Sequence, residues 1–550
     1  MSTLSVTASG PAADAIAAHV PELVSEKFAS RLFARDATLW GPDAESESAI
    51  RLSWVGLARS SRPLVGEIAA IHDDLTSKGF DHVVLCGMGG SSLAPEVICA
   101  TAGKDITILD SSDPDYVRTA LQDRLATTIL VVSSKSGSTV ETDSQRRTYE
   151  GAFRDAGHDP VDHIVIVTDP GSPLDQQARA AGYRVVNADP DVGGRYSALT
   201  AFGLVPSGLA GVDVEALLDD AESVADLLAE DDDANPALRL AAAMAGTSPL
   251  RDKLAIVDDG SGISGFADWA EQLIAESTGK AGTGVLPVVV TDDSDPEIQR
   301  PAADVTVARL VGEDDDEGTE PAGEVDASRS EVAVGGSLGA QMLLWEVATA
   351  AAGRILGINP FDQPDVESAK KAARDQLDKG AGTTSDPAAT DGAIEIRSLG
   401  GDWLGDATTV EAALDALFAQ LDPARGYVAI MAYLDRLADA PLAAARRAVA
   451  LRTERPTTFG WGPRFLHSTG QFHKGGPAIG VYLQVTTTPH EDLAIPGREF
   501  TFGDFIASQA GGDAAVLADH GRPVLQLHLT DHNTGLAQLS RALGVPAGGA

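Results

Sequence analysis

The chain has 550 residues, of which 43% are hydrophobic, so it is long enough for two or three domains with sizeable cores. Its 81 acidic and 41 basic residues give a formal net charge of −40, which argues against a nucleic-acid backbone as the partner. Salt screens this charge over ~8 Å, so an anionic ligand would have to be held by local donors.

The cysteine content and the lengths of the apolar runs indicate the cellular compartment. The two cysteines, Cys86 and Cys99, exclude a disulfide framework and favour a reducing cytoplasm. The N-terminus lacks a basic segment followed by an apolar run, so no signal peptide is predicted. No uninterrupted apolar run reaches about 18 residues, so no membrane-spanning helix is predicted. We therefore expect a cytoplasmic protein without a membrane partner.

The first 60 residues are predicted to be helical, because large apolar side chains recur there at roughly helical spacing. These side chains are Leu23, Phe28, Leu32, Phe33 and Trp40. We therefore assign residues 1–60 to a helical N-terminal region.

A glycine-rich turn at 87–92, Gly-Met-Gly-Gly-Ser-Ser, follows a predicted strand at 82–86 and precedes a helix that starts near Leu93. Gly90 and the glycine before it would let the backbone approach a ligand, and Ser91 is expected to cap the helix. Dinucleotide-binding folds use the same device, but a serine stands in the third glycine position here.

A second turn of this kind spans residues 133–142, with the sequence Ser-Ser-Lys-Ser-Gly-Ser-Thr-Val-Glu-Thr. An apolar strand leads into it and a helix follows, so unpaired N–H groups at the helix start would favour an anion. Hydroxyl donors and one full positive charge would complete a phosphate cradle. The residues concerned are Ser134, Lys135, Ser136 and Thr139. The alternative is an ordinary Ser/Thr cap of a helix.

Further strands at 107–110, 163–168 and 184–187 alternate with helices, which predicts βαβ units and a parallel sheet. We assign residues 61–240 to this first α/β domain. Near its end, Gly-Gly-Arg-Tyr-Ser forms a predicted tight turn that would aim Arg195 into a cleft. A loop with a surface arginine is the alternative.

A second α/β domain is assigned to residues 241–392 and begins with a strand at 253–258. The helix that follows carries Gln272, Glu276 and Lys280 four residues apart, so these side chains share one face. The same spacing also fits a Glu–Lys pair on the surface.

The rest of this domain contains a strand at 286–291, a very apolar helix at 338–356 and a helix at 366–377 that presents Lys370. Residues 380–392, rich in Gly, Thr, Ala and Asp, form a predicted linker.

The last segment, 393–550, repeats the α/β pattern and either completes the second lobe or forms a third. Its loop at 459–477 holds five glycines and two histidines, His467 and His473, beside one arginine and one lysine. Loops of this kind on a rigid scaffold tend to carry function. A metal site built from both histidines is the rival, but the loop supplies no carboxylate or cysteine ligand.

Five stretches in the same order resemble the glucose-6-phosphate isomerase family, over about residues 60–375. They are residues 87–95, 134–142, 193–197, 276–280 and 359–370. Each stretch is modest alone, whereas five in order are specific. The resemblance implies a two-lobed sugar-isomerase fold, in which each lobe is a three-layer αβα unit with a parallel sheet.

The resemblance also implies a role for each matching position. Positions that would hold the phosphate and the sugar are Gly90, Ser91, Gln272 and the segment 134–139. Glu276 would be the base that shuttles a proton, Arg195 would face the developing enediolate, and Lys370 would lie at the sugar ring.

One departure concerns the ring-opening histidine, which the family places between the Glu and Lys segments. No histidine lies between Glu276 and Lys370 here. The chain resembles the isomerase part of fused transaldolase–isomerase proteins, and its loop at 459–477 is similar to the missing segment. We expect this loop to bring His467, or else His473, to the sugar ring, because an imidazole that titrates near ~6.5 can move a proton there. The alternative is that neither histidine meets the substrate.

The implied reaction interconverts glucose 6-phosphate and fructose 6-phosphate through a cis-enediolate, with no cofactor and no metal, in a homodimer. Two alternatives remain open: an isomerase of another phosphosugar, including mannose 6-phosphate, and a non-catalytic phosphosugar-binding regulator. A regulator would need only the cradle, so the set of Glu276, Arg195 and Lys370 favours an enzyme.

Overall fold

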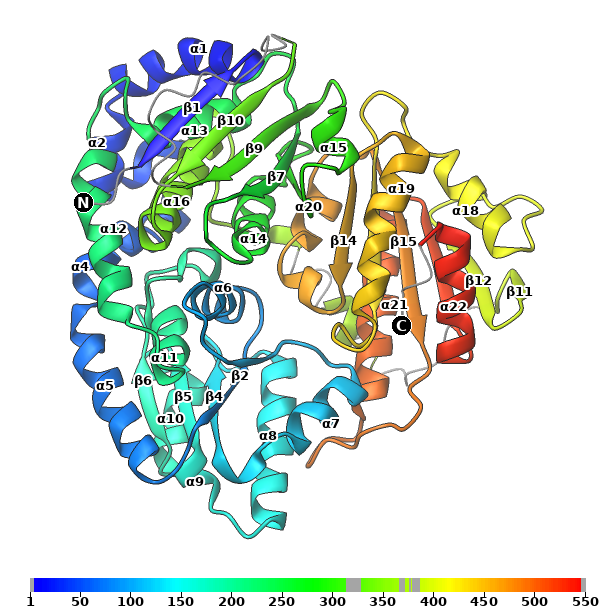
Figure 1. The fold of residues 1–550 in the computed structure, drawn as a ribbon, viewed down its shortest axis with the longest axis horizontal. Coiled ribbons are helices and arrows are strands. Elements are labelled where there is room, and N and C mark those ends of the chain that lie inside the picture. Colours follow the sequence, from blue (N-terminus) through cyan, green and yellow to red (C-terminus); the bar gives the residue numbers. More distant parts are fainter. Residues whose placement is uncertain (1–3, 313–327, 366–370, 375–376, 378–385, 546–550) are drawn as a thin grey trace.

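The computed structural model describes residues 4–312, 328–365, 371–374, 377 and 386–545. These residues form three β-sheets, and helices flank each of them (Figure 1). The sequence-based prediction of an α/β protein with parallel sheets is confirmed. Within the described ranges, no helix combines the length and apolar character that crossing a membrane requires.

The first sheet is fully parallel, with the strand order β3-β2-β4-β5-β6. Its strands are β2 (His82–Cys86), β3 (Thr107–Leu109), β4 (Thr128–Ser133), β5 (Ile164–Thr168) and β6 (Arg184–Asn187). Consecutive strand residues enter two different apolar cores, as expected of a sheet that is buried on both faces.

Helices cover both faces of the first sheet. One face packs against α5 (Arg62–Ser77), α6 (Leu93–Thr101) and α11 (Ala201–Leu209). The other face packs against α7 (Pro114–Gln122), α8 (Val140–Asp155) and α10 (Pro173–Ala180). The residues between β4 and α8 are the predicted phosphate cradle.

The second sheet has the strand order β1-β10-β9-β7-β8. Its strands are β1 (Ser5–Ser9), β7 (Lys253–Asp259), β8 (Leu286–Val289), β9 (Val305–Val311) and β10 (Glu331–Gly335). All pairs are parallel except β1 with β10. The strand β1 departs from the predicted helical N-terminus, because its partner lies more than 320 residues away and leaves no local pattern.

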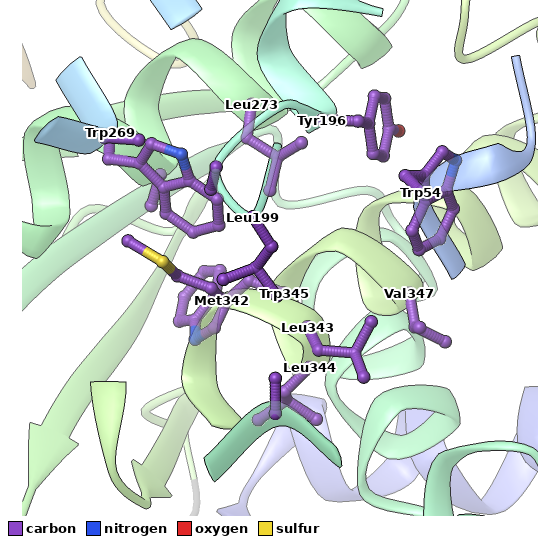
Figure 2. Close-up of a cluster of buried hydrophobic side chains, with 14 of the residues drawn as sticks. Trp54, Tyr196, Leu199, Trp269, Leu273, Met342, Leu343, Leu344, Trp345 and Val347 are labelled. Carbon is purple, nitrogen blue, oxygen red and sulfur yellow. The ribbon is translucent and has the colours of Figure 1, made fainter. Parts of the chain in front are cut away.

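Four helices pack on this sheet or between it and the first: α1 (Pro11–Ser25), α13 (Pro236–Ala245), α14 (Phe266–Thr278) and α16 (Leu338–Leu356). Figure 2 shows the core around α16, where Trp345 and Leu344 lie among residues from several elements. In the same core Trp54 stacks on Tyr196 with 5.0 Å between ring centroids. This packing supports the turn that carries Arg195, because Tyr196 is the next residue of that turn.

A third sheet has the order β11-β12-β16-β15-β13-β14 and begins at residue 389. Its strands are β11 (Ala389–Asp391), β12 (Ile394–Leu399), β13 (Tyr427–Tyr433), β14 (Thr457–Trp461), β15 (Gly480–Thr487) and β16 (Val524–Leu529). The predicted linker at 380–392 is therefore wrong at its end, where residues 389–391 pair with β12. Helices α18 (Val410–Phe418), α19 (Ala445–Thr453) and α22 (His532–Leu543) cover the outer face of the sheet.

The inner face of the third sheet carries α20 (Gly470–Gly475) and α21 (Phe502–Asp519) and joins one core with β7, β8 and β9 of the second sheet. Phe502 and Ile495 enter the core of the first sheet instead. The yellow-to-red segment in Figure 1 therefore lies against both other sheets. Residues 459–477, which comprise the end of β14 and most of its connection to β15, reach the junction of all three sheets.

Other α-helices in the described ranges are α2 (Phe28–Phe33), α3 (Glu45–Ser48), α4 (Leu57–Ser60), α9 (Pro160–His163), α12 (Val214–Leu228) and α15 (Pro296–Gln299).

Candidate active site

The glycine-rich turn after β2 contacts the turn that carries Arg195. The first turn is η3 (Gly89–Ser91) and the second is η5 (Gly194–Tyr196), both short 3-10 turns. A Cβ built on Gly90 would lie 1.8 Å from the carbonyl oxygen of Gly194. Only glycine at position 90 permits this approach, which brings the two turns into one site.

The helix after the first turn is not capped as predicted. The N-cap of α6 is Ser92, and its side chain makes no capping bond. The Ser92 hydroxyl instead donates to the Gly89 carbonyl at 3.1 Å, which closes the turn on itself. The prediction that Ser91 caps this helix is therefore wrong.

Arg195 is held from several sides, and only 4% of its surface is exposed. Its Nε donates to Ser277 Oγ at 2.9 Å, and its Nη1 donates to Gln363 Oε1 at 2.8 Å. Its Nη2 donates to the carbonyl of Pro360 at 2.7 Å. Nη1 also lies 3.4 Å from Oε1 of Glu276. The alternative of a surface arginine is wrong, because this charge faces a buried carboxylate.

Gln272 and Glu276 lie on one face of α14, as the spacing predicts, and both side chains are buried. Gln272 Nε2 donates to Glu276 Oε2 at 3.1 Å. The carboxylate is therefore contacted on one side by an amide and on the other by the guanidinium of Arg195. Such a group can accept a proton from a substrate carbon while its orientation stays fixed.

Lys280 continues the same row but does not form the surface pair that the spacing also allowed. Its ammonium donates to the carbonyl of Asp362 at 2.6 Å and pairs with the carboxylate of the same residue at 2.7 Å. Burial, followed by the nearby charge of Arg195, lowers the pKa of Lys280 to about 8. Lys280 and Arg195 thus bind the same turn, at 360–363.

His467 reaches this site from the third sheet. It ends the 3-10 turn η8 (Arg464–His467), directly before α20. A Cβ built on Gly89 would lie 3.1 Å from His467 Cβ and 2.7 Å from Gln272 Nε2. The glycine-rich turn, the row on α14 and the histidine therefore meet at Gly89.

Glu141 is a candidate site residue that sequence reasoning passed over. It lies in the first turn of α8, directly after the cradle, and is 7% exposed. Its Oε1 lies 3.2 Å from Nε2 of His467 and accepts a hydrogen bond from Gln509 Nε2 at 2.7 Å. A carboxylate within hydrogen-bond distance of an imidazole fixes the orientation of the ring. The only signal in the sequence was an acid at a helix start, which is common.

His473 lies in a different environment. Its ring is buried in the core between the second and third sheets, where Nδ1 lies 3.0 Å from the Tyr427 hydroxyl. Tyr482 donates to its backbone carbonyl at 3.0 Å. Burial, followed by the charge of Lys474, lowers the pKa of His473 well below its usual value. The structure does not bring this imidazole to Glu276.

The cradle at 134–139 is a compact hydroxyl-lined turn. Ser134 Oγ accepts a hydrogen bond from Gly137 N at 3.1 Å and donates to Thr139 Oγ1 at 3.3 Å. The hydroxyls of Ser136 and Ser138 lie 2.7 Å apart. Thr139 occupies the N-cap position of α8 without a side-chain capping bond. Its hydroxyl therefore does not serve as the ordinary cap that was the alternative.

Lys135 points its ammonium at the neighbouring strand ends. It pairs with Asp169 at 2.8 Å and donates to the Pro190 carbonyl at 2.9 Å. About a third of the Lys135 side chain, 33%, is exposed. Its charge lies beside the cradle, where an anion would compete with Asp169 for it.

Lys370, predicted to lie at the sugar ring, falls outside the described residues. Among the residues that the structure describes, no group of three or more His, Cys, Asp or Glu side chains could hold a metal ion. The rival interpretation of His467 and His473 as metal ligands has no support in this part of the chain.

Comparison with known proteins agrees with this geometry. The family described as "Phosphoglucose isomerase" matches residues 64–283, which include η3, the cradle, η5 and α14. A "Probable glucose-6-phosphate isomerase" from Natronomonas pharaonis is 30% identical over 411 residues, which cover 67% of this chain and 95% of that protein. A "Glucose-6-phosphate isomerase" from Rippkaea orientalis is 36% identical over 216 residues, 37% of this chain and 41% of that protein.

Solved structures show the fold. A hypothetical protein from Thermus thermophilus superimposes with a TM-score of 0.57 at 24% identity, covering 68% of this chain and all of that one. A glucose-6-phosphate isomerase from Chlamydia trachomatis gives a TM-score of 0.50 at 22% identity, over 64% of this chain and 78% of that one.

Proposed function

Because the chain belongs to the phosphoglucose isomerase family, we propose that the site around Glu276 interconverts glucose 6-phosphate and fructose 6-phosphate. The observation that carries this proposal is the buried Glu276 carboxylate, held between Gln272 and Arg195 at 3.1 and 3.4 Å. A proton-shuttling base and a fixed positive charge beside it are what aldose–ketose isomerisation needs.

Glu276 moves the proton between C2 and C1 of the open-chain sugar. Arg195 supplies a permanent planar charge next to this carboxylate and stabilises the enediolate that forms when the proton leaves carbon. Most of its donors are already bound to protein acceptors, so the guanidinium does not reorient during the reaction. Gln272 orients the carboxylate and offers its other polar atom to the sugar.

His467 opens the ring, with Glu141 as its partner. Ring opening requires a group that gives and takes a proton near neutral pH, and an imidazole beside a carboxylate suits this task. The distance of 3.2 Å between His467 and Glu141 supports this assignment. His473 is the weaker candidate, because its ring is enclosed by Tyr427 and other core residues.

The phosphate binds at the cradle 134–139, at the N-terminus of α8. The helix offers unpaired N–H groups and a partial positive charge, and Ser134, Ser136 and Thr139 add hydroxyl donors. Gly90 and Ser91 hold the sugar. Lys135 either exchanges its ion pair with Asp169 for one with the phosphate, or keeps the pair with Asp169 and orders the cradle turn. Lys370 is proposed at the sugar ring from the family resemblance alone.

Replacement of the base tests the proposal. Glu276→Gln keeps the shape and removes the proton acceptor, so turnover of both sugar phosphates should fall ~10²-fold or more while substrate binding persists. Coupled assays in both directions, with mannose 6-phosphate as a third substrate, measure activity and substrate breadth. Isothermal titration with a substrate analogue and a melting curve serve as controls for binding and folding. Activity within a few-fold of the parent would remove Glu276 from the mechanism.

The wider setting is also proposed. Cys86 and Cys99 are buried free thiols, which supports a reducing cytoplasm. A homodimer is proposed from the family resemblance, and light scattering measures it. Three units with the boundaries 61–240, 241–392 and 393–550 are proposed, after the N-terminal region 1–60. Two strands cross these boundaries, because β1 joins the sheet of the second unit and β11, before residue 393, joins that of the third.

A further inference from the structure

We propose that Arg464 is a positioning residue, whose ion pairs hold the turn that carries His467 in place between the sheets. The inference rests on the proposed role of His467 in the reaction. It concerns a different question, namely how His467, on the connection between two strands of the third sheet, is held at a fixed position relative to Glu276 on helix α14.

Arg464 joins the third sheet to the first. It begins η8, the turn that His467 ends, so the two residues are three positions apart in one 3-10 turn. Its Nη1 donates to Asp110 Oδ2 at 2.6 Å, and its Nη2 pairs with Glu96 on α6. Asp110 is fully buried, and 14% of the Arg464 side chain is exposed. A planar guanidinium that binds two carboxylates fixes orientation as well as distance.

The far side of the turn is held by two side-chain hydrogen bonds. Ser468 Oγ donates to Glu271 Oε1 at 2.6 Å, and Gln471 Nε2 donates to the Gly279 carbonyl at 3.0 Å. Both partners belong to α14 or to the residue that follows it. The segment 464–471 is therefore attached to the first sheet at one end and to the base helix at the other. Arg464 is the attachment to the first sheet, and it is made by a charged side chain three positions before His467.

Arg436 offers a matched control. Its Nη1 donates to Glu96 Oε1 at 3.0 Å, and its Nε lies 3.4 Å from Asp110 Oδ1, so it pairs with the same two acids. It follows β13 and is 28 positions from Arg464 in the sequence. Loss of Arg436 removes a comparable partly buried charge without releasing the histidine turn.

The experiment is a double-mutant cycle between positions 464 and 467, with kcat and KM measured for both sugar phosphates. Arg464→Met should lower kcat ~10²-fold with little change in KM, because a small displacement of a reacting group is costly. In the His467→Ala background it should cause no further loss. Arg436→Met should keep kcat close to that of the parent. Arg464→Lys, which retains the charge but not the fork, should give an intermediate loss.

The outcomes separate the two claims. Equal losses from Arg464→Met in both backgrounds, or equal losses from the two arginine substitutions, would overturn the positioning role. Full activity of Arg464→Lys and Arg464→Met, together with inactive His467→Ala, would overturn it as well and leave the role of His467 intact. Full activity of His467→Ala would instead refute the ring-opening assignment. Repeating the cycle with Arg464→Lys keeps the test decisive if Arg464→Met does not fold.

Discussion

At the scale of the residue, Glu271 makes the stability of the protein depend on pH. It precedes Gln272 on α14 and accepts the hydroxyl of Ser468. Burial, helped by the neighbouring Asp268, raises the pKa of Glu271 from 4.5 to about 8, against the opposing effects of the Ser468 hydrogen bond and Arg464. The folded chain therefore binds a proton here that the unfolded chain has already released over this range. The contribution of Glu271 to stability falls as the pH rises from 4.5 to about 8.

Glu271→Gln should flatten this dependence, because an amide has the shape of the protonated acid and does not titrate. The free energy of unfolding, measured with urea at several pH values between 4.5 and about 8, should decline less steeply than in the parent. Glu411→Gln, at the exposed start of α18, is the control and should follow the parent profile. Identical profiles for Glu271→Gln and the parent would contradict the prediction.

At the scale of the element, the contact between η3 and η5 sets the position of Arg195. Ser197 reinforces it, since its hydroxyl lies within hydrogen-bond distance of both the Gly194 carbonyl, at 2.6 Å, and the Gly90 carbonyl, at 3.4 Å. Two tight turns from different parts of the chain thus touch through backbone atoms, with no side chain between them. Backbone-to-backbone contact leaves little room for adjustment, so the geometry of Arg195 depends on both turns.

Gly90→Ala should therefore separate these turns, because its methyl group would lie 1.8 Å from the Gly194 oxygen and 3.2 Å from Arg195 N. We expect kcat/KM to fall ~10²-fold and the melting temperature to drop. Gly194→Ala is a sharp control, since no described atom lies within 4 Å of a Cβ built there. Equal behaviour of the two variants would show that the close approach has no consequence.

At the scale of the whole molecule, the net charge of −40 opposes folding through repulsion between like charges. Raising the salt concentration from ~0.1 to ~1 M shortens the screening length from ~10 to ~3 Å. The melting temperature should therefore rise with KCl, while buried pairs such as Arg464 with Asp110 are screened much less. Sucrose at equal osmolarity is the control for general solute effects. A melting temperature that falls with KCl would contradict the prediction.

The sequence by itself determined the features that depend on local pattern. Alternation of apolar strands with helices predicted the first sheet, with strands such as 82–86 and 184–187 at their observed bounds. The row of Gln272 and Glu276 followed from helical spacing alone. An apolar strand followed by a run of glycine or hydroxyl residues identified the turns at 87–92 and 133–142. These features are local because each turn, strand or helix face is set by neighbours a few residues away.

Tertiary structure alone decided which distant groups meet. In the sequence Glu141 is an ordinary acidic residue at the start of a helix. In the structure it lies beside His467, 326 positions later in the chain. His467 and His473 are six residues apart, and only packing separates the ring at the site from the ring between the sheets. The strand β1 found its partner β10 in the same way. Such contacts are chosen by burial and complementarity over the whole chain, and no local periodicity records them.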